Sequence, residues 1–160
     1  SMLLLDSHDT ARFRNVVGGD TQFHLAGMGL LLTYPGVPSI FAGDEIGLRG
    51  AWGEDARRTI DWSESDWDQP FFAELQKLVK IRRKSHALAH GGLRWVLVED
   101  DLIAFVRESK REKLLVVIAR SAVQTSLRGI SDVTDVLYGP ALSQGVFRSA
   151  GPALGIYRLT

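Results

Sequence analysis

The sequence predicts two kinds of structure in succession, an α/β part over residues 1–90 and an all-β part over residues 91–160. In the first part, two short apolar runs are each followed by a segment with helical signals, which predicts the order strand, helix, strand, helix. After residue 92, short runs rich in Val, Ile, Leu and aromatic residues recur between turn-prone segments. That second pattern predicts an antiparallel β-sandwich, so we expect two domains that meet near residue 90.

The first expected strand covers residues 2–6, where the unbroken apolar run from Met2 to Leu5 is typical of a strand buried on both faces of a parallel sheet. The helix that follows is expected over residues 20–34. Asp20 can cap its first turn, and its apolar residues are dense enough to predict burial on most sides. The helix is expected to end at Pro35-Gly36, because proline and glycine disfavour its continuation.

The second expected strand covers residues 38–42 and is again short and apolar. A long polar segment with three tryptophans follows over residues 43–69. Asp68 and Pro70 then supply a cap and a first-turn proline, and an apolar stripe predicts a helix over residues 70–86.

The all-β part shows the composition of strands in six places. Each stretch is short, rich in β-branched and aromatic residues, and bounded by turn-prone sequence. The six stretches are LRWVLVE, LIAFVRE, KLLVVIA, DVTDVLY, GVFRS and LGIYRL.

Composition excludes several classes of function. Nineteen basic residues balance nineteen acidic ones, so no overall field would attract nucleic acid or an anionic membrane. No apolar run is long enough to span a membrane, and the chain contains no cysteine, which fits a cytoplasmic protein. His86 and His90 have a spacing compatible with zinc, but no third ligand is evident, so we expect neither a metal nor another cofactor.

Ser7, His8 and Asp9 stand in a row directly after the first expected strand. A serine-hydrolase triad is disfavoured, because its members normally come from separated segments and consecutive residues leaving a strand point in alternating directions. The alternative from the residues alone is that Ser7 and Asp9 merely end the strand and begin a turn.

A wider set of motifs carries a resemblance to a known family. The stretches LLLDSHDTARF, YPGVPSIFAGDEIGL, RRTIDW and LQKLVKIRRKSHALAHG occur in that order. Together they resemble the C-terminal third of retaining glycoside hydrolases of the α-amylase superfamily, in particular the cyclomaltodextrinase, neopullulanase and maltogenic amylase group. Ala11 departs from the proline that is common in that motif, and RRTIDW is a loose version of its usual counterpart.

This resemblance implies a fold. Members of the family carry a (β/α)8 barrel, a TIM barrel, followed by an antiparallel β-domain. Residues 1–90 would then be the last two β/α units of a truncated barrel, and residues 91–160 a C-terminal β-sandwich. Six of the eight barrel strands would be absent from this chain.

The resemblance also implies a site. Asp9 would be the aspartate that stabilises the transition state, and His8 would hydrogen-bond the same sugar. Arg12 matches the basic residue of the motif and is expected among the substrate-binding residues, where it would order the site through a carboxylate pair, with a structural ion pair as the alternative. Trp52 lies in a loop where its face would stack on a sugar ring, local packing being the alternative. The nucleophile and general acid follow the fourth and fifth strands in the family, so this chain alone is expected to be inactive.

Three functions remain open at this level. The parent protein is expected to hydrolyse α-glucosidic bonds in malto-oligosaccharides, cyclodextrins or related α-glucans, with an α-glucan oligosaccharide as the partner. Alternatively, the chain acts as a carbohydrate-binding or dimerisation module, or the parent is a transglycosylase or isomerase. We also expect a homodimer through exposed barrel edges at residues 3–5 and 38–41, because unpaired edges and an uncovered apolar face favour self-association.

Overall fold

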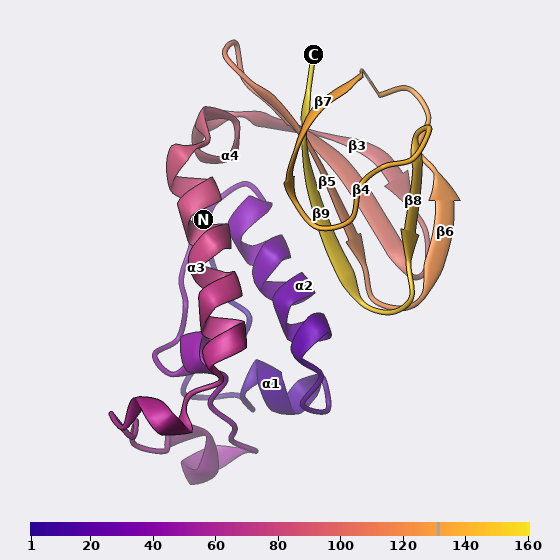
Figure 1. The fold of residues 1–160 in the computed structure, drawn as a ribbon. Helices are drawn as coiled ribbons and strands as arrows, with labels where there is room; N and C mark the ends of the chain where they lie inside the picture. The colour runs from indigo at the N-terminus through magenta and orange to yellow at the C-terminus, as the bar shows by residue number, and fades with distance from the viewer. Residues whose placement is uncertain (131) are drawn as a thin grey trace.

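The computed structural model describes residues 1–130 and 132–160. The four α-helices of the described residues gather on one side of the molecule, and the strands of the second half of the chain form the other side (Figure 1). The longest two helices run side by side, and α2 (Thr21–Thr33) lies between α3 (Gln69–Lys84) and the sheet. The strand–helix–strand–helix order and the antiparallel sheets expected from the sequence are both present.

The first two strands are shorter than expected. β1 (Met2–Leu3) pairs in parallel with β2 (Val37–Pro38), and the carbonyl of Leu3 accepts one further hydrogen bond from the amide of Ser39 at 2.8 Å. Within the described residues, neither strand has a second strand beside it. A pair of parallel strands without further neighbours has few ladder bonds to extend it, which accounts for the difference from residues 2–6 and 38–42.

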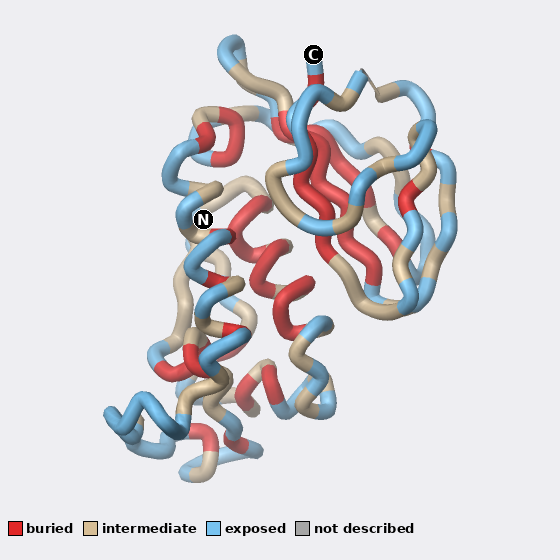
Figure 2. Tube along the Cα trace, viewed as in Figure 1, coloured by how far each residue is buried: buried red, intermediate tan, exposed pale blue. Residues whose placement is uncertain are grey.

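Two helices follow β1. After α1 (Phe13–Val16), the longer α2 (Thr21–Thr33) begins at Asp20, whose carboxylate accepts a hydrogen bond from the amide of Phe23 at 2.9 Å. This bond satisfies one of the free amides of the first turn, as the sequence predicts. Most of α2 is buried (Figure 2), which confirms the expectation from its dense apolar residues.

The segment after β2 contains three short 3₁₀ helices and then two α-helices. The 3₁₀ helices are η1 (Asp44–Ile46), η2 (Gly53–Arg57) and η3 (Glu64–Asp66), and the α-helices are α3 (Gln69–Lys84) and α4 (His86–His90). The single helix predicted over residues 70–86 is therefore wrong at its C-terminal end. Ser85 is extended (φ −89°, ψ 119°), and its hydroxyl accepts a hydrogen bond from the amide of Leu88 at 3.0 Å. A serine that caps a new helix in this way ends the preceding one.

The second half of the chain forms two antiparallel sheets. A five-stranded sheet has the order β3-β4-β5-β9-β7, and a two-stranded sheet pairs β6 with β8. β6 escaped prediction because its short sequence VQTS is largely polar. The strands are β3 (Gly92–Val98), β4 (Leu102–Glu108), β5 (Lys113–Ala119), β6 (Val123–Ser126), β7 (Val133–Tyr138), β8 (Val146–Ser149) and β9 (Ala153–Leu159).

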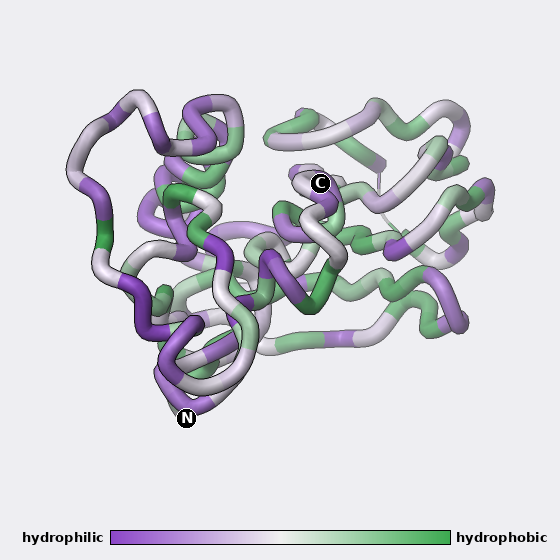
Figure 3. Tube along the Cα trace, turned by 90° about the horizontal axis from the view of Figure 1, so that it is seen from below, coloured by the Kyte–Doolittle hydropathy of each residue, from purple (hydrophilic) through white to green (hydrophobic). Residues whose placement is uncertain are grey.

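The three central strands of the five-stranded sheet, β4, β5 and β9, are buried on both faces. Phe105, Val116 and Ile156 belong to a hydrophobic cluster shared with the helices, whereas Leu115 and Tyr157 belong to a second cluster on the side of the smaller sheet. Figure 3 shows hydrophobic stretches along the strands and hydrophilic residues mainly at the turns. Two buried faces explain why β4 and β5 read as continuous apolar runs. The division into two domains near residue 90 stays a prediction, although the helices and the sheet share one core.

A buried arginine joins the helices to the sheet. Arg107 of β4 is 1% exposed, and its guanidinium donates to the carbonyls of Thr33 at the end of α2, Leu88 in α4 and Gly91. Burial lowers the pKa of Arg107 to about 10, which still leaves it charged at neutral pH. In the described part of the chain, no helix is long and apolar enough to cross a membrane.

Candidate active site

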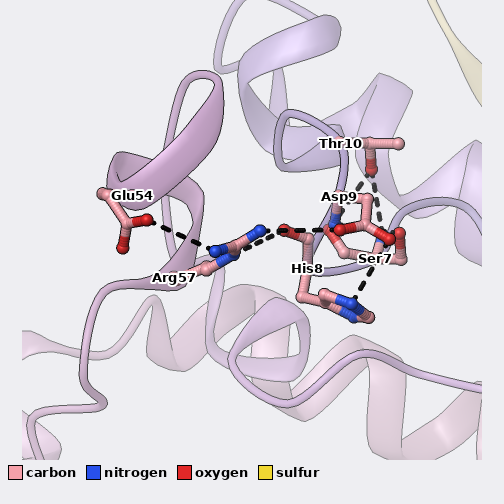
Figure 4. Close-up of polar contacts among 6 residues, drawn as sticks. All are labelled: Ser7, His8, Asp9, Thr10, Glu54 and Arg57. Atoms are coloured by element: carbon pink, nitrogen blue, oxygen red, sulfur yellow. Dashed lines mark hydrogen bonds and ion pairs between the residues drawn. The ribbon is translucent and has the colours of Figure 1, made fainter.

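The loop between β1 and α1 contains the Ser7-His8-Asp9 motif and folds into a tight turn (Figure 4). The amide of Thr10 donates to the carbonyl of Ser7 at 3.2 Å, and the amide of Ser7 donates to the hydroxyl of Thr10 at 2.9 Å. The hydroxyl of Ser7 accepts a hydrogen bond from the amide of Asp9 at 3.2 Å. Ser7 therefore shapes the turn through both its backbone and its hydroxyl.

The turn presents His8 and Asp9 to solvent. Their side chains are 66% and 68% exposed, and the His8 Nε2 atom lies 3.3 Å from the Asp9 Oδ2 atom. A carboxylate and an imidazole side by side at the surface can together bind neighbouring hydroxyl groups of a ligand.

A third member of this site comes from η2, 48 residues further along the chain. Arg57 donates from Nε to the carbonyl of His8 at 2.9 Å, and its Nη2 atom lies 3.5 Å from the Asp9 Oδ1 atom. On its other side Arg57 pairs with Glu54 at 3.3 Å (Figure 4). Sequence reasoning missed Arg57. The RRTIDW motif that contains it offered a signal, but not the partner that this arginine contacts.

Arg12 lies beneath this exposed cluster and is 2% exposed. Its Nη1 atom donates to the Asp44 Oδ1 atom and to the carbonyl of Ala42, both at 2.9 Å, and its Nε atom donates to the carbonyl of Ala56 at 3.0 Å. The guanidinium also stacks over the Phe41 ring at 3.9 Å. Arg12 thus forms the ion pair with a carboxylate that was considered for it, and this pair with Asp44 is buried inside the structure. The burial of Arg12 disfavours the expected contact with substrate, which stays a prediction.

The carboxyl group of Asp44 occupies an unusual electrostatic environment. Burial raises its pKa to about 8, the neighbouring Asp6 carboxyl raises it as well, and the Arg12 guanidinium acts in the opposite direction. Asp6 is itself 3% exposed. Two acidic groups and one cation therefore share a buried space below the turn that carries Asp9.

The tryptophans of the long loop behave differently from one another. Trp52, directly before η2, is 73% exposed, so its ring is free to stack on a ligand. Trp67 instead packs edge-on against Phe72 and donates from Nε1 to the carbonyl of Asp61 at 3.0 Å. The substrate-binding role predicted for Trp52 remains a prediction.

The residues that the structure describes offer no cluster of three or more His, Asp or Glu side chains able to hold a metal ion. His86 and His90, the first and last residues of α4, have ring centroids 5.0 Å apart. The site is therefore best described by its exposed members His8, Asp9 and Arg57 and by the buried residues that support them.

Comparisons with known proteins identify relatives of this chain. No profile of a known protein family matches the chain. The chain is 34% identical over 130 residues to a cyclomaltodextrinase of Bacillus sp, covering 80% of this chain and 23% of that protein. It is 38% identical over 118 residues to neopullulanase 2 of Thermoactinomyces vulgaris, covering 72% of this chain and 20% of that protein. The structure matches the debranching enzyme of Nostoc punctiforme with a TM-score of 0.83 and 31% identity, over 98% of this chain and 35% of that one.

These relatives are glycoside hydrolases of one family, and the chain belongs to it: it is a member of the α-amylase family. The chain spans about a fifth of the length of the curated relatives that it matches. These matches establish the family of the chain but not the activity of the whole protein.

Proposed function

We propose that this chain is part of a retaining glycoside hydrolase that acts on α-glucosidic bonds in malto-oligosaccharides, cyclodextrins or related α-glucans. The names of its relatives, cyclomaltodextrinase and neopullulanase, support this substrate class. The single observation that carries the proposal is the exposed His8-Asp9 pair on the hydrogen-bonded turn that follows β1. Exposed acidic and imidazole groups that the fold itself does not consume are available to a ligand.

In this proposal Asp9 stabilises the transition state. Hydrolysis with retention passes through an oxocarbenium-like sugar ring, and hydrogen bonds to its hydroxyl groups strengthen as the ring distorts. Asp9 accepts such bonds, and His8 hydrogen-bonds the same sugar. Arg57 is a positioning residue, because its contacts to Asp9 and to the carbonyl of His8 fix the turn from the side of η2.

The barrel origin of the first half of the chain is part of the same proposal. Two parallel strands with a helix between them, followed by a further helix, are what the last two β/α units of a (β/α)8 barrel would contribute. Residues 1–90 are then the barrel part, and residues 91–160 form the β-sandwich domain. Asp9 would lie at the carboxyl end of its strand, where such barrels hold their active sites.

The chain is proposed to be inactive by itself. A retaining glycosidase needs two carboxyl groups roughly 5–5.5 Å apart on either side of the bond. Asp44 is 2% exposed and is occupied by Arg12, and the Glu45 carboxylate accepts a hydrogen bond from the amide of Gly43 at 2.7 Å. Neither offers an accessible nucleophile or acid.

The test is a hydrolysis assay of the purified chain on cyclodextrin, pullulan and maltotriose, with binding of the same sugars followed by calorimetry. We expect no turnover from the chain. Turnover that survives rigorous purification and is abolished by Asp9→Asn would contradict the proposed absence of the catalytic pair. Absence of both turnover and binding in the full-length enzyme would overturn the substrate class.

A second proposal, self-association, has its own support. Met2, Leu4 and Val37 on or beside β1 and β2 are 67%, 46% and 67% exposed. Exposed apolar side chains beside unpaired strand edges favour contact with a second copy. Light scattering over a wide concentration range tests this, and we expect a dimer; a monomer throughout contradicts it.

A further inference from the structure

Three ionisable side chains share the buried space under the Ser7–Thr10 turn. Asp6, Arg12 and Asp44 are exposed by only 3%, 2% and 2%. Asp6 and Arg12 stand at the two ends of the loop that contains the turn, and Asp44 opens η1 after β2. If both carboxyl groups were ionised, this space would hold two negative charges and one positive charge out of water, which is costly.

The hydrogen bonds leave one position open for a proton. Asp6 accepts through Oδ2 from the amide of Phe13, whereas its Oδ1 atom is buried and has no partner among the hydrogen bonds of the described residues. Asp44 accepts through Oδ1 from Arg12, and it is buried beside Asp6, whose carboxyl group contributes to raising the pKa of Asp44. A proton between the two carboxyl groups would give Asp6 Oδ1 its missing partner, since a protonated carboxyl group donates.

We propose that Asp44 is a neutral carboxylic acid at neutral pH, that it donates a hydrogen bond to the Asp6 carboxylate, and that this shared proton holds the loop of Asp9 in place. With one proton in the pair, the buried cluster contains one negative and one positive charge and is neutral as a whole. Burial and the neighbouring Asp6 both raise the pKa of Asp44, to about 8, which agrees with this geometry.

The other charged groups near η1 do not change the net charge that surrounds Asp44. α3 packs against η1, and its cap residue Asp68 is paired with Arg14 at 2.6 Å. Glu45, the next residue of η1, is bound to the amide of Gly43. These groups form their own neutral pair or local bond, so Arg12 is the cation and Asp6 the anion that Asp44 faces directly.

The pair is connected to the exposed site by short links. Asp6 immediately precedes the turn that carries His8 and Asp9. Arg12 binds the carbonyl of Ala56, the residue before Arg57, so it supports both sides of the Asp9–Arg57 contact. Ionisation of Asp44 would place repulsion between its carboxylate and Asp6 at the base of both loops. The role as a support for substrate binding rests on the proposed function, but the shared proton does not.

Isotope-edited infrared spectroscopy of this chain tests the shared proton without any need for activity. With aspartate labelled on its side-chain carbon, we expect a protonated-carboxyl band at pH 7 that disappears as the pH passes through about 8. Asp44→Asn and Asp6→Asn should each abolish the band, because either removes one member of the pair. The exposed Asp135→Asn is the matched control and should retain it. A wild-type spectrum without the band at pH 7 overturns the proposal, whether or not the variants fold.

The link to the site has a separate readout. In the wild-type chain, the backbone amide resonances of Asp9 and Arg57 should shift with a midpoint near pH 8, and in Asp44→Asn this transition should be lost. The asparagine can still accept from Arg12 and donate to Asp6, so the folded structure is expected to persist. If the infrared band titrates but the amide resonances of Asp9 and Arg57 do not shift, the shared proton is supported and its connection to Asp9 is wrong. Failure of the glucan assays alone would affect neither result.

Discussion

Two arginine–aspartate pairs lie in the same loops of this protein and differ mainly in burial. Arg12 and Asp44 are 2.9 Å apart with side chains 2% and 3% exposed, whereas Arg57 and Asp9 are 3.5 Å apart with side chains 45% and 68% exposed. Removing one partner of a buried pair leaves an uncompensated charge away from water. An exposed pair is screened by solvent and is easily exchanged for a ligand.

The buried pair and the exposed pair have different roles. The buried pair joins the chain after β1 to the chain after β2 through carbonyl and carboxylate contacts of a single guanidinium. The exposed pair stands above it and keeps its polar atoms accessible. A site that must hold a flexible ligand benefits from such an arrangement, because a rigid base positions the groups that bind.

Arg12→Ala should produce the largest loss of stability. The substitution leaves the carboxyl groups of Asp6 and Asp44 without their cation and the carbonyls of Ala42 and Ala56 without a donor. We expect the free energy of unfolding in urea to fall by about 3–5 kcal/mol. A loss below about 1 kcal/mol would mean that the buried pair contributes no more than a surface pair.

Asp9→Asn should have the largest effect on turnover while leaving the fold intact. In the full-length enzyme proposed to contain this chain, we expect kcat to fall by at least about a hundredfold, because transition-state hydrogen bonds of several kcal/mol are at stake. The unfolding free energy should change little, because the Asp9 side chain is 68% exposed. Asp135→Asn on β7 is the control and should leave kcat unchanged. Unaltered turnover in Asp9→Asn would remove Asp9 from the mechanism.

His24 extends the comparison to a buried group without an ion partner. Its ring packs between Phe13 and Phe71, and neither ring nitrogen has a hydrogen-bond partner among the described residues. Burial lowers the pKa of His24 from 6.5 to about 3, and the nearby Arg14 acts in the same direction.

Because the unfolded chain protonates His24 first, the free energy of unfolding should decrease as the pH falls from about 6.5 toward about 3. This group contributes up to about 1.4 kcal/mol per pH unit. His24→Leu should remove this contribution to the pH dependence of the unfolding free energy. His90→Leu, at an exposed position, should leave that dependence unchanged. Equal slopes in His24→Leu and the wild-type chain would exclude His24 as the source.

Arg57→Ala should have the smallest effect on stability. We expect a change in the unfolding free energy of less than about 1 kcal/mol, measured in urea beside Arg12→Ala. A loss as large as that of Arg12→Ala would abolish the distinction between the two pairs. In the full-length enzyme, a rise in KM or a fall in kcat without such a loss would support Arg57 as a positioning residue.

Much of the local structure follows from residues that are close in the sequence. Asp20 and Asp68 cap their helices as predicted, because a carboxylate needs only the next turn of its own chain to find a free amide. The runs LIAFVRE and KLLVVIA form strands because their apolar, β-branched composition suits a doubly buried sheet. The motifs around Ser7 to Arg12 and Asp44 were sufficient to identify the family.

The tertiary structure alone decided which polar groups are buried and which remain free. Arg12 and Arg57 both stand in polar loop sequence, yet Arg12 is enclosed by chain segments thirty or more residues away and Arg57 reaches the surface. Likewise, Ser85 divides a helix only because its hydroxyl has two uses: it accepts from the amide of Leu88 and donates to Glu112 in the loop before β5. Burial depends on which distant segments pack against a side chain, and desolvation then sets its charge, its pKa and its value to the fold. Local sequence determines neither the burial of a side chain nor the charge and pKa that follow from that burial.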